Sequence, residues 1–91
     1  MIICSCIIHF ELPHVQSLKG RRSITNSVKE KLKAFNVSVI DISSEYAKEA
    51  DIAFVFLSQN SLKAAQYRES IEQMLDINFS EYHFELEYEE I

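Results

Sequence analysis

The sequence predicts an α+β protein in which strands and helices follow one another in the order β-α-β-β-α-β. Some segments have apolar residues at every second position, which is typical of strands, and others at every third or fourth position, which is typical of helices. Loop-forming residues are scarce, since the 91-residue chain holds one Gly and one Pro. An apolar fraction of 47% and a charged fraction of 25% are those of globular proteins. We therefore expect residues 1–91 to form a single domain.

The first strand is predicted over residues 1–12, where apolar and mixed side chains alternate strictly. The apolar positions face the core. The mixed positions, which include Ile3, Ile7 and His9, form a partly open face. Pro13 ends the strand because it has no N–H to donate to a sheet.

The first helix is predicted from Ser17 to about residue 35, because its apolar residues recur at helical spacing. Ser17 is a favourable N-cap, and Asn36 marks an abrupt stop before the next strand. The apolar stripe consists of Leu18, Ile24, Val28, Leu32 and Phe35, with Thr25 at its edge.

Two further strands are predicted at 37–42 and 50–58, joined by a loop at 43–49. The first of these is short and rich in β-branched residues. The second is nearly continuous in apolar residues, which predicts a central strand buried on both faces.

A second helix is predicted after Asn60 or Ser61, either of which can cap it, and a last strand is predicted at 82–89. In that strand aromatic or apolar residues alternate with glutamates and a histidine. The expected inner stripe of the helix consists of Leu62, Ala65, Ile71, Met74 and Leu75.

This order of elements is that of the ferredoxin-like fold. Two helices then cover one face of a four-stranded antiparallel sheet with the strand order 4-1-3-2. In this topology the chain leaves the first strand, begins the first helix and forms the 43–49 loop at the same end of the sheet.

The charges are distributed unevenly along the chain. The net charge is −5, which argues against a general nucleic-acid binder. However, Lys and Arg gather between residues 19 and 33, whereas residues 81–90 hold five Glu and no Lys or Arg. Separate basic and acidic faces still allow local binding of phosphates.

Cations stand at the start of the first helix, where exposed backbone N–H groups already favour anions. A bound phosphate would account for them, and Gly20 would let it approach the backbone. Arg21 also falls within the apolar stripe, so an internal ion pair is an equally open interpretation for that residue. The acidic candidates for such a pair are Asp41, Asp51 and Asp76. The candidate anion- or RNA-binding residues are Lys19, Gly20, Arg21 and Arg22.

Lys29, Lys31 and Lys33 face mostly outward on the same helix, which is typical of a solvated surface that provides solubility.

The open face of the sheet is a second candidate surface. Proteins of this shape that bind RNA there stack bases on aromatic residues of the central strands. The first strand offers none at its open positions, and the orientation of Phe54 and Phe56 is left open by the sequence. The face is better suited to a partner protein or a second copy, with Ile3, Ile7 and His9 as interface candidates.

Nothing in the sequence points to catalysis, and we expect no cofactor. Cys4 and Cys6 lack the spacing of redox or zinc motifs and are interpreted as buried apolar residues. A metal site at His9 and His83 is a weaker alternative to exposed cross-strand pairs. No metal ligands are therefore assigned. The absence of a leader and of a membrane-spanning run predicts a cytoplasmic protein with no membrane partner.

Two motifs of the sequence are Ser17-Leu18-Lys19-Gly20-Arg21-Arg22 and Phe35-Asn36-Val37-Ser38-Val39. Both resemble motifs of the YlxP-like family of small bacterial proteins of unknown function. Leu12-Pro13 and the opening of the 50–58 strand fit the same family. Gly20 departs from the acidic residue usual at that position. The resemblance implies a ferredoxin-like fold and no established activity. It also implies gene neighbours that act in translation initiation and ribosome maturation.

These observations lead to two hypotheses. The first is a non-enzymatic accessory protein that binds ribosomal RNA or a ribosome-associated protein through the start of the first helix. The alternative is a homodimeric interaction module that uses the open sheet face.

Overall fold

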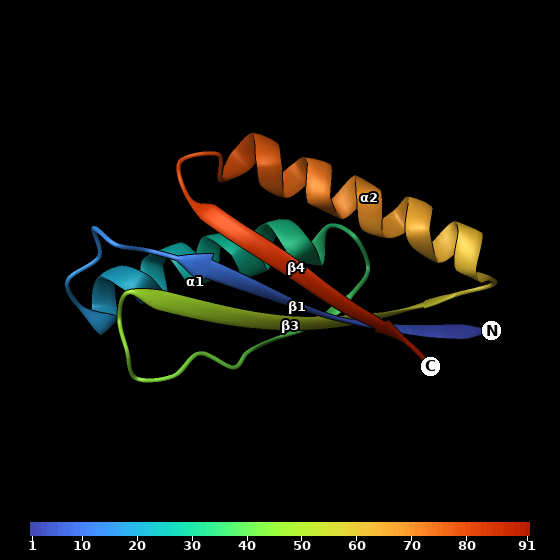
Figure 1. Ribbon diagram of the computed structural model, residues 1–91, viewed down its shortest axis with the longest axis horizontal. Coiled ribbons are helices and arrows are strands. Elements are labelled where there is room, and N and C mark those ends of the chain that lie inside the picture. The colour runs from blue at the N-terminus through green and yellow to red at the C-terminus, as the bar shows by residue number, and fades with distance from the viewer.

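The computed structural model describes residues 1–91, which form four strands and two helices (Figure 1). In chain order these are β1 (Ile2–Glu11), α1 (Leu18–Lys33), β2 (Ser38–Asp41), β3 (Glu49–Ser58), α2 (Ser61–Asn78) and β4 (His83–Glu90). The order β-α-β-β-α-β is the one that the sequence predicts.

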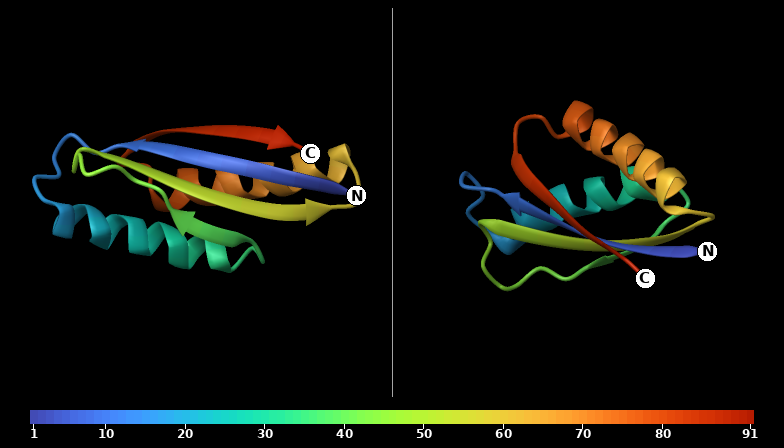
Figure 2. Two further views of the ribbon diagram at one scale, coloured as in Figure 1. Left: turned by 90° about the horizontal axis from the view of Figure 1, so that it is seen from below. Right: turned by 45° about the vertical axis from the view of Figure 1, so that its right-hand side comes forward.

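The four strands form one antiparallel sheet with the order β2-β3-β1-β4. Read from the other edge, this is the predicted order 4-1-3-2, so the ferredoxin-like α+β fold is confirmed. Both helices lie on the same side of the sheet, and the opposite side carries no covering element (Figure 2). We call this uncovered side the outer sheet face. It consists of the odd-numbered positions of β1, β3 and β4 and the even-numbered positions of β2.

The hydrophobic core lies between the sheet and the helices, in a single cluster of 15 buried residues. The even positions of β1 are fully buried, as the alternation along this strand predicts. Phe10 is at one end of the core, with its ring 5.5 Å from that of Phe84 and 6.3 Å from that of Phe79. These aromatic contacts join β1 to β4 and to the end of α2.

α1 begins where the sequence predicts and ends at Lys33, two residues before the predicted end. The hydroxyl of Ser17 accepts a hydrogen bond of 3.0 Å from the Gly20 N–H and caps the helix. Asn36 has φ 55°, a left-handed conformation that Asn tolerates better than most residues, and the chain turns there into β2. Thr25, predicted at the edge of the apolar stripe, is fully buried.

β3 is a central strand, but it is not buried on both faces as its nearly continuous apolar sequence predicts. Ala50, Ile52, Phe54 and Phe56 are buried in the core. Val55 and Leu57 face outward, and Leu57 is 65% exposed. The prediction is wrong because no layer covers the outer sheet face.

The inner stripe of α2 also differs from the prediction. Asn60 is its N-cap, accepting a 2.9 Å hydrogen bond from the Lys63 N–H. Leu62, expected in the core, is 69% exposed, and Ala64 is buried instead. The helix is rotated so that Ala64, Ile71 and Leu75 face the sheet. Neither helix combines the length and apolar character that crossing a membrane requires.

Candidate functional site

The start of α1 and the 43–49 loop meet at one end of the sheet, as the predicted topology requires. Lys48 of this loop donates hydrogen bonds from Nζ to the carbonyl oxygens of Pro13 (2.8 Å) and Val15 (3.3 Å). These bonds join the loop to the segment that leads into α1. The start of α1, which holds the four candidate residues from Lys19 to Arg22, therefore lies close to the loop, and of these four Arg21 contacts the loop directly.

Arg21 is anchored within the protein. Its Nη1 donates to the carbonyl oxygens of Ser44 (2.6 Å), Tyr46 (2.8 Å) and Glu49 (3.3 Å). The ion pairs of the structure do not include Arg21, so none of the acidic partners considered from the sequence forms a salt bridge with it. A guanidinium shared among three carbonyls holds the loop against α1.

Gly20 leaves room for the helix cap. A Cβ at this position would lie 3.3 Å from the Ser17 Oγ and 3.7 Å from a methyl group of Val15. The first of these contacts is tighter than an ordinary van der Waals contact, and the φ angle of Gly20 lies outside the left-handed region. The structure thus supplies a packing reason for the glycine.

Lys19 and Arg22 are exposed, and neither takes part in an ion pair. At 100° per residue they fall on one side of α1 together with Lys29 and Lys33. We call these four residues the α1 basic stripe. It spans about 21 Å at a rise of 1.5 Å per residue. Its one acidic neighbour is Glu30, whose carboxylate lies 3.7 Å from the Lys33 Nζ in an exposed pair.

Asp41, at the end of β2, is held by Ser43. Partial burial acts to raise the pKa of this carboxyl. The Ser43 hydroxyl and N–H, at 2.5 Å and 2.9 Å from Asp41 Oδ1, outweigh this effect and lower the pKa. The Ser43 hydroxyl oxygen also accepts a 2.9 Å bond from the Asp51 N–H on β3. These bonds keep β2 and β3 in register where the loop begins.

The outer sheet face contains all three interface candidates, because Ile3, Ile7 and His9 occupy odd positions of β1. Ile7 is 37% exposed. Phe54 and Phe56, whose orientation the sequence leaves open, both point into the core. The outer sheet face therefore carries no Phe, Tyr or Trp on its central strands, and it lacks the stacking surface that these residues give to sheet-face RNA binders.

His9 pairs with Asp51 on the neighbouring strand, with 2.6 Å between Nδ1 and Oδ1. The hydrogen bond to Asp51 raises the pKa of His9, and the carboxylate charge adds to this effect. His83 lies 3.7 Å from the Glu85 carboxylate in an exposed pair on β4. No group of three or more His, Cys, Asp or Glu side chains is placed to hold a metal ion.

Cys4 and Cys6 are fully buried, with 3.7 Å between their sulfur atoms. Burial raises the pKa of Cys6 to about 12, and the neighbouring Cys4 adds to the shift. A thiol with so high a pKa remains protonated and is a poor nucleophile.

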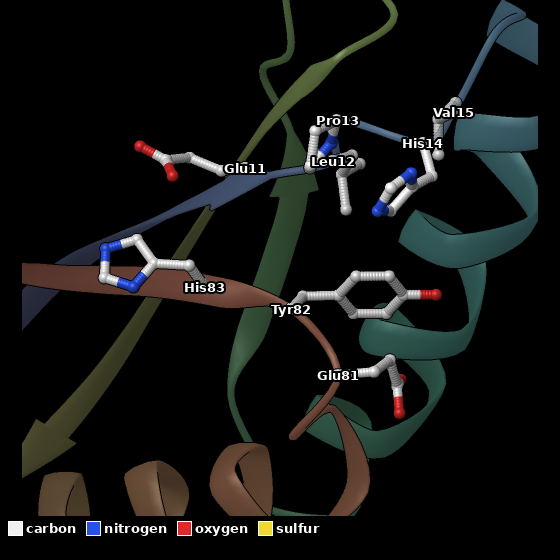
Figure 3. Close-up of a pocket in the computed structure, with 8 residues that line it drawn as sticks. All are labelled: Glu11, Leu12, Pro13, His14, Val15, Glu81, Tyr82 and His83. Atoms are coloured by element: carbon white, nitrogen blue, oxygen red, sulfur yellow. The ribbon is translucent and has the colours of Figure 1, made fainter.

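A pocket of about 380 Å³ lies where the loop after β1 meets the start of β4 (Figure 3). In Figure 3 the His14 imidazole points toward the Tyr82 ring, and the Glu11 carboxylate points away from both. No hydrogen bond joins the titratable side chains around it. No pattern in the sequence marks His14, because only the pairing of β1 with β4 brings residues 14 and 82 together. The pocket is lined by Glu11, Leu12, Pro13, His14, Val15, Glu81, Tyr82 and His83.

Residues 3–88 match the family described as "Protein of unknown function (DUF503)". The chain belongs to this family. The DUF503 match spans all six elements of the fold. No curated protein matches the sequence.

Among solved structures, the chain is similar to "De novo designed protein Foldit4", with a TM-score of 0.55 and 13% sequence identity. The alignment covers 97% of this chain and 94% of the designed protein. At this level of identity the similarity concerns the fold alone.

Proposed function

We propose that this DUF503 protein is a non-enzymatic, cytoplasmic accessory protein of translation that contacts ribosomal RNA through the α1 basic stripe. The observation that carries the proposal is the exposure of Lys19 and Arg22 without protein partners, in line with Lys29 and Lys33. The resemblance of the sequence motifs to the YlxP-like family, with its translation-related gene neighbours, supports the ribosome as the place of action. A membrane partner is not part of the proposal.

The shape of the stripe suits a nucleic-acid backbone. Its four cations follow one side of a straight helix over about 21 Å, a length that several successive phosphates occupy. Contacts of this kind are made to phosphates and not to base edges, so we expect binding with little sequence preference.

Arg21 has a different role in this proposal from Lys19 and Arg22. Its Nη1 is used by three loop carbonyls, so it positions the 43–49 loop and is not free to meet a phosphate. A charge-removal experiment should therefore spare Arg21, because its loss would disturb the loop as well as the charge.

The test is co-sedimentation with ribosomal subunits of the native host, at low and at moderate salt. The variant is Lys19→Ala with Arg22→Ala. The matched control is Lys31→Ala with Lys63→Ala, which removes the same charge from exposed positions away from the stripe. Wild type should bind at low salt and release at moderate salt, because phosphate binding displaces counterions.

We expect the Lys19/Arg22 variant to bind at least about tenfold more weakly, with a log–log salt slope shallower by roughly 1.4, since each single-strand phosphate contact contributes about 0.7. The Lys31/Lys63 control should bind nearly as wild type does. Equal binding by wild type and the Lys19/Arg22 variant, or no binding at either salt, would contradict the proposal.

The second candidate function is a homodimeric interaction module. It is favoured by the exposed apolar side chains of the outer sheet face, among them Ile7, Val55 and Leu57. The sedimentation mass tests this function: it requires a wild-type dimer that Ile7→Asn dissociates, and a monomer mass that is independent of concentration would exclude it.

A further inference from the structure

The outer sheet face carries apolar side chains over much of β1, β2 and β3 and carboxylates along β4. Glu11, Glu49 and Asp51 add further carboxylates at one end of β1 and β3. Strand register places these side chains in rows that run across the sheet. One row is Ile40, Ala53, Ile7 and Glu87, and the next is Ser38, Val55, Ser5 and Glu89. Each row thus passes from the β2 edge of the sheet to an acidic residue on β4.

The apolar part of this face is open to solvent. Ile40 is 62% exposed and Leu57 is 65% exposed, and neither helix approaches this side of the sheet (Figure 2). Most exposed apolar side chains of soluble proteins are scattered singly. Here they are neighbours on adjacent strands, which is the arrangement of a surface that another molecule covers.

The charges of the same face are all carboxylates or histidines, since no Lys or Arg occupies any of its positions. Asp51 is paired with His9, and Glu85 lies 3.7 Å from His83. Glu87 and Glu89 take part in no ion pair. The face therefore has an uncompensated negative side along β4.

A shallow hollow of about 170 Å³ lies between β1 and β4, at the boundary between the apolar and acidic parts. It is lined by Ser5, Ile7, Glu87, Tyr88 and Glu89. A Lys or Arg side chain fits this chemistry, because its aliphatic stem can pack on Ile7 while its charged group meets the two carboxylates.

We propose that the outer sheet face binds an amphipathic helix of a partner protein that has Lys or Arg along one flank. The apolar side of the helix packs on β1 and β3, and the basic flank lies over β4. Alternate residues of β4 are about 6.7 Å apart, and helix residues four apart rise by about 6 Å. Cations at every fourth position of a helix parallel to β4 therefore match Glu85, Glu87 and Glu89.

Charge complementarity favours this occupant over the others. A second copy of the chain, packed face to face, would bring a second set of carboxylates and no cation to neutralise them. A nucleic acid would bring phosphates next to the same glutamates. A basic amphipathic helix supplies both the apolar area and the missing positive charge.

The test uses the full chain and a synthetic helical peptide of about 18 residues, with Leu along one side and Lys at three positions four apart on one flank. A second peptide has Glu in place of these Lys residues. Affinity is measured by fluorescence anisotropy at two salt concentrations. The protein variants are Glu87→Gln with Glu89→Gln, and the matched control Glu45→Gln with Glu69→Gln at exposed positions elsewhere.

We expect the Lys peptide to bind and the Glu peptide not to bind. The Glu87/Glu89 variant should bind about five- to tenfold more weakly with less salt dependence, whereas the control should stay within about twofold of wild type. Ile7→Asn should weaken binding by a similar factor without changing the salt dependence. Circular dichroism should show that each variant keeps its fold.

Three results would overturn the proposal. The first is equal affinity for the two peptides, and the second is an equal loss in the Glu87/Glu89 and control variants. The third is a sedimentation mass that shows wild type as a dimer which Ile7→Asn dissociates and the Lys peptide does not displace. That last result would assign the face to a second copy, whereas a monomer mass that is independent of concentration would exclude it.

Discussion

Arg21 and Arg22 are adjacent in the sequence and have different surroundings. The Arg21 guanidinium donates hydrogen bonds to three backbone carbonyl oxygens. The Arg22 side chain is exposed and takes part in no ion pair. The hydrogen bonds to Ser44 and Tyr46 are exposed, and the one to Glu49 is partly buried. Loss of the charged donor is most costly at the Glu49 carbonyl, because water replaces a donor incompletely at a partly buried site. Substitution of Arg21 is therefore expected to affect the stability of the fold, whereas substitution of Arg22 is expected to affect binding alone.

We expect Arg21→Ala to lower the free energy of unfolding by about 1–2 kcal/mol. Arg22→Ala should change it by less than about 0.5 kcal/mol, as exposed substitutions usually do. Urea denaturation followed by circular dichroism measures both values. Equal unfolding midpoints for the two variants would show that the loop contacts of Arg21 contribute nothing to stability.

α1 depends on its two ends as much as on its apolar stripe. Ser17 caps the first turn, and Asn36 turns the chain into β2 in a left-handed conformation. A β-branched residue is strained there, because its Cβ approaches the backbone carbonyl. The junction between α1 and β2 is therefore sensitive to the type of residue at position 36.

Asn36→Val should reduce the free energy of unfolding by about 1–2 kcal/mol, and Asn36→Gly should change it by less than about 0.5 kcal/mol. Asn26→Val, at an exposed position within α1, serves as the control for the change in side chain. Thermal or urea unfolding gives the comparison. A loss at position 26 as large as that at position 36 would contradict the argument from backbone conformation.

Among the elements, β3 and α2 show why apolar sequence does not specify burial. β3 is apolar at nearly every position, yet its odd positions lie on the outer sheet face. In α2, Leu62 is exposed while the smaller Ala64 is buried. An element buries the side that another layer covers, and its own sequence does not state which side that is.

The core of the molecule encloses both thiols, and this has a measurable consequence. Cys4 and Cys6 have no solvent-exposed surface, and burial raises the pKa of Cys6 to about 12. We expect a thiol reagent to modify them only when the whole domain opens, since both belong to the central strand β1.

In the native protein at neutral pH, modification should therefore be slow, and it should become immediate in concentrated urea. A Ser27→Cys variant, with its new thiol on the exposed side of α1, should react at once and provides the control. The modification of the thiols is followed by the absorbance of the anion that the reagent releases. Rapid modification of native wild type would mean that β1 opens locally.

The charge distribution of the whole molecule unites the two proposals. The α1 basic stripe belongs to a helix that covers one side of the sheet (Figure 2), and Glu85, Glu87 and Glu89 of β4 occupy positions on the other side. A net charge of −5 hides this separation. The two proposals assign phosphates to the basic surface and a basic protein segment to the acidic one.

The order of the elements, the caps at Ser17 and Asn60 and the stop at Asn36 were all predictable from the sequence. These features depend on side-chain periodicity and on hydrogen bonds between residues two to four positions apart, so the information is local. The inward positions of β1 follow from the same local pattern.

Long-range packing determines the hydrogen-bond partners of Arg21 and the exposure of one side of β3. The carbonyls that Arg21 binds lie 23 to 28 residues further along the chain, and the loop that presents them takes its place only when β2 pairs with β3. The outer sheet face is open because both helices pack on the other side, so Val55 and Leu57 remain exposed although they are apolar. Local sequence specifies what each segment becomes, whereas burial and side-chain partners depend on which segments meet.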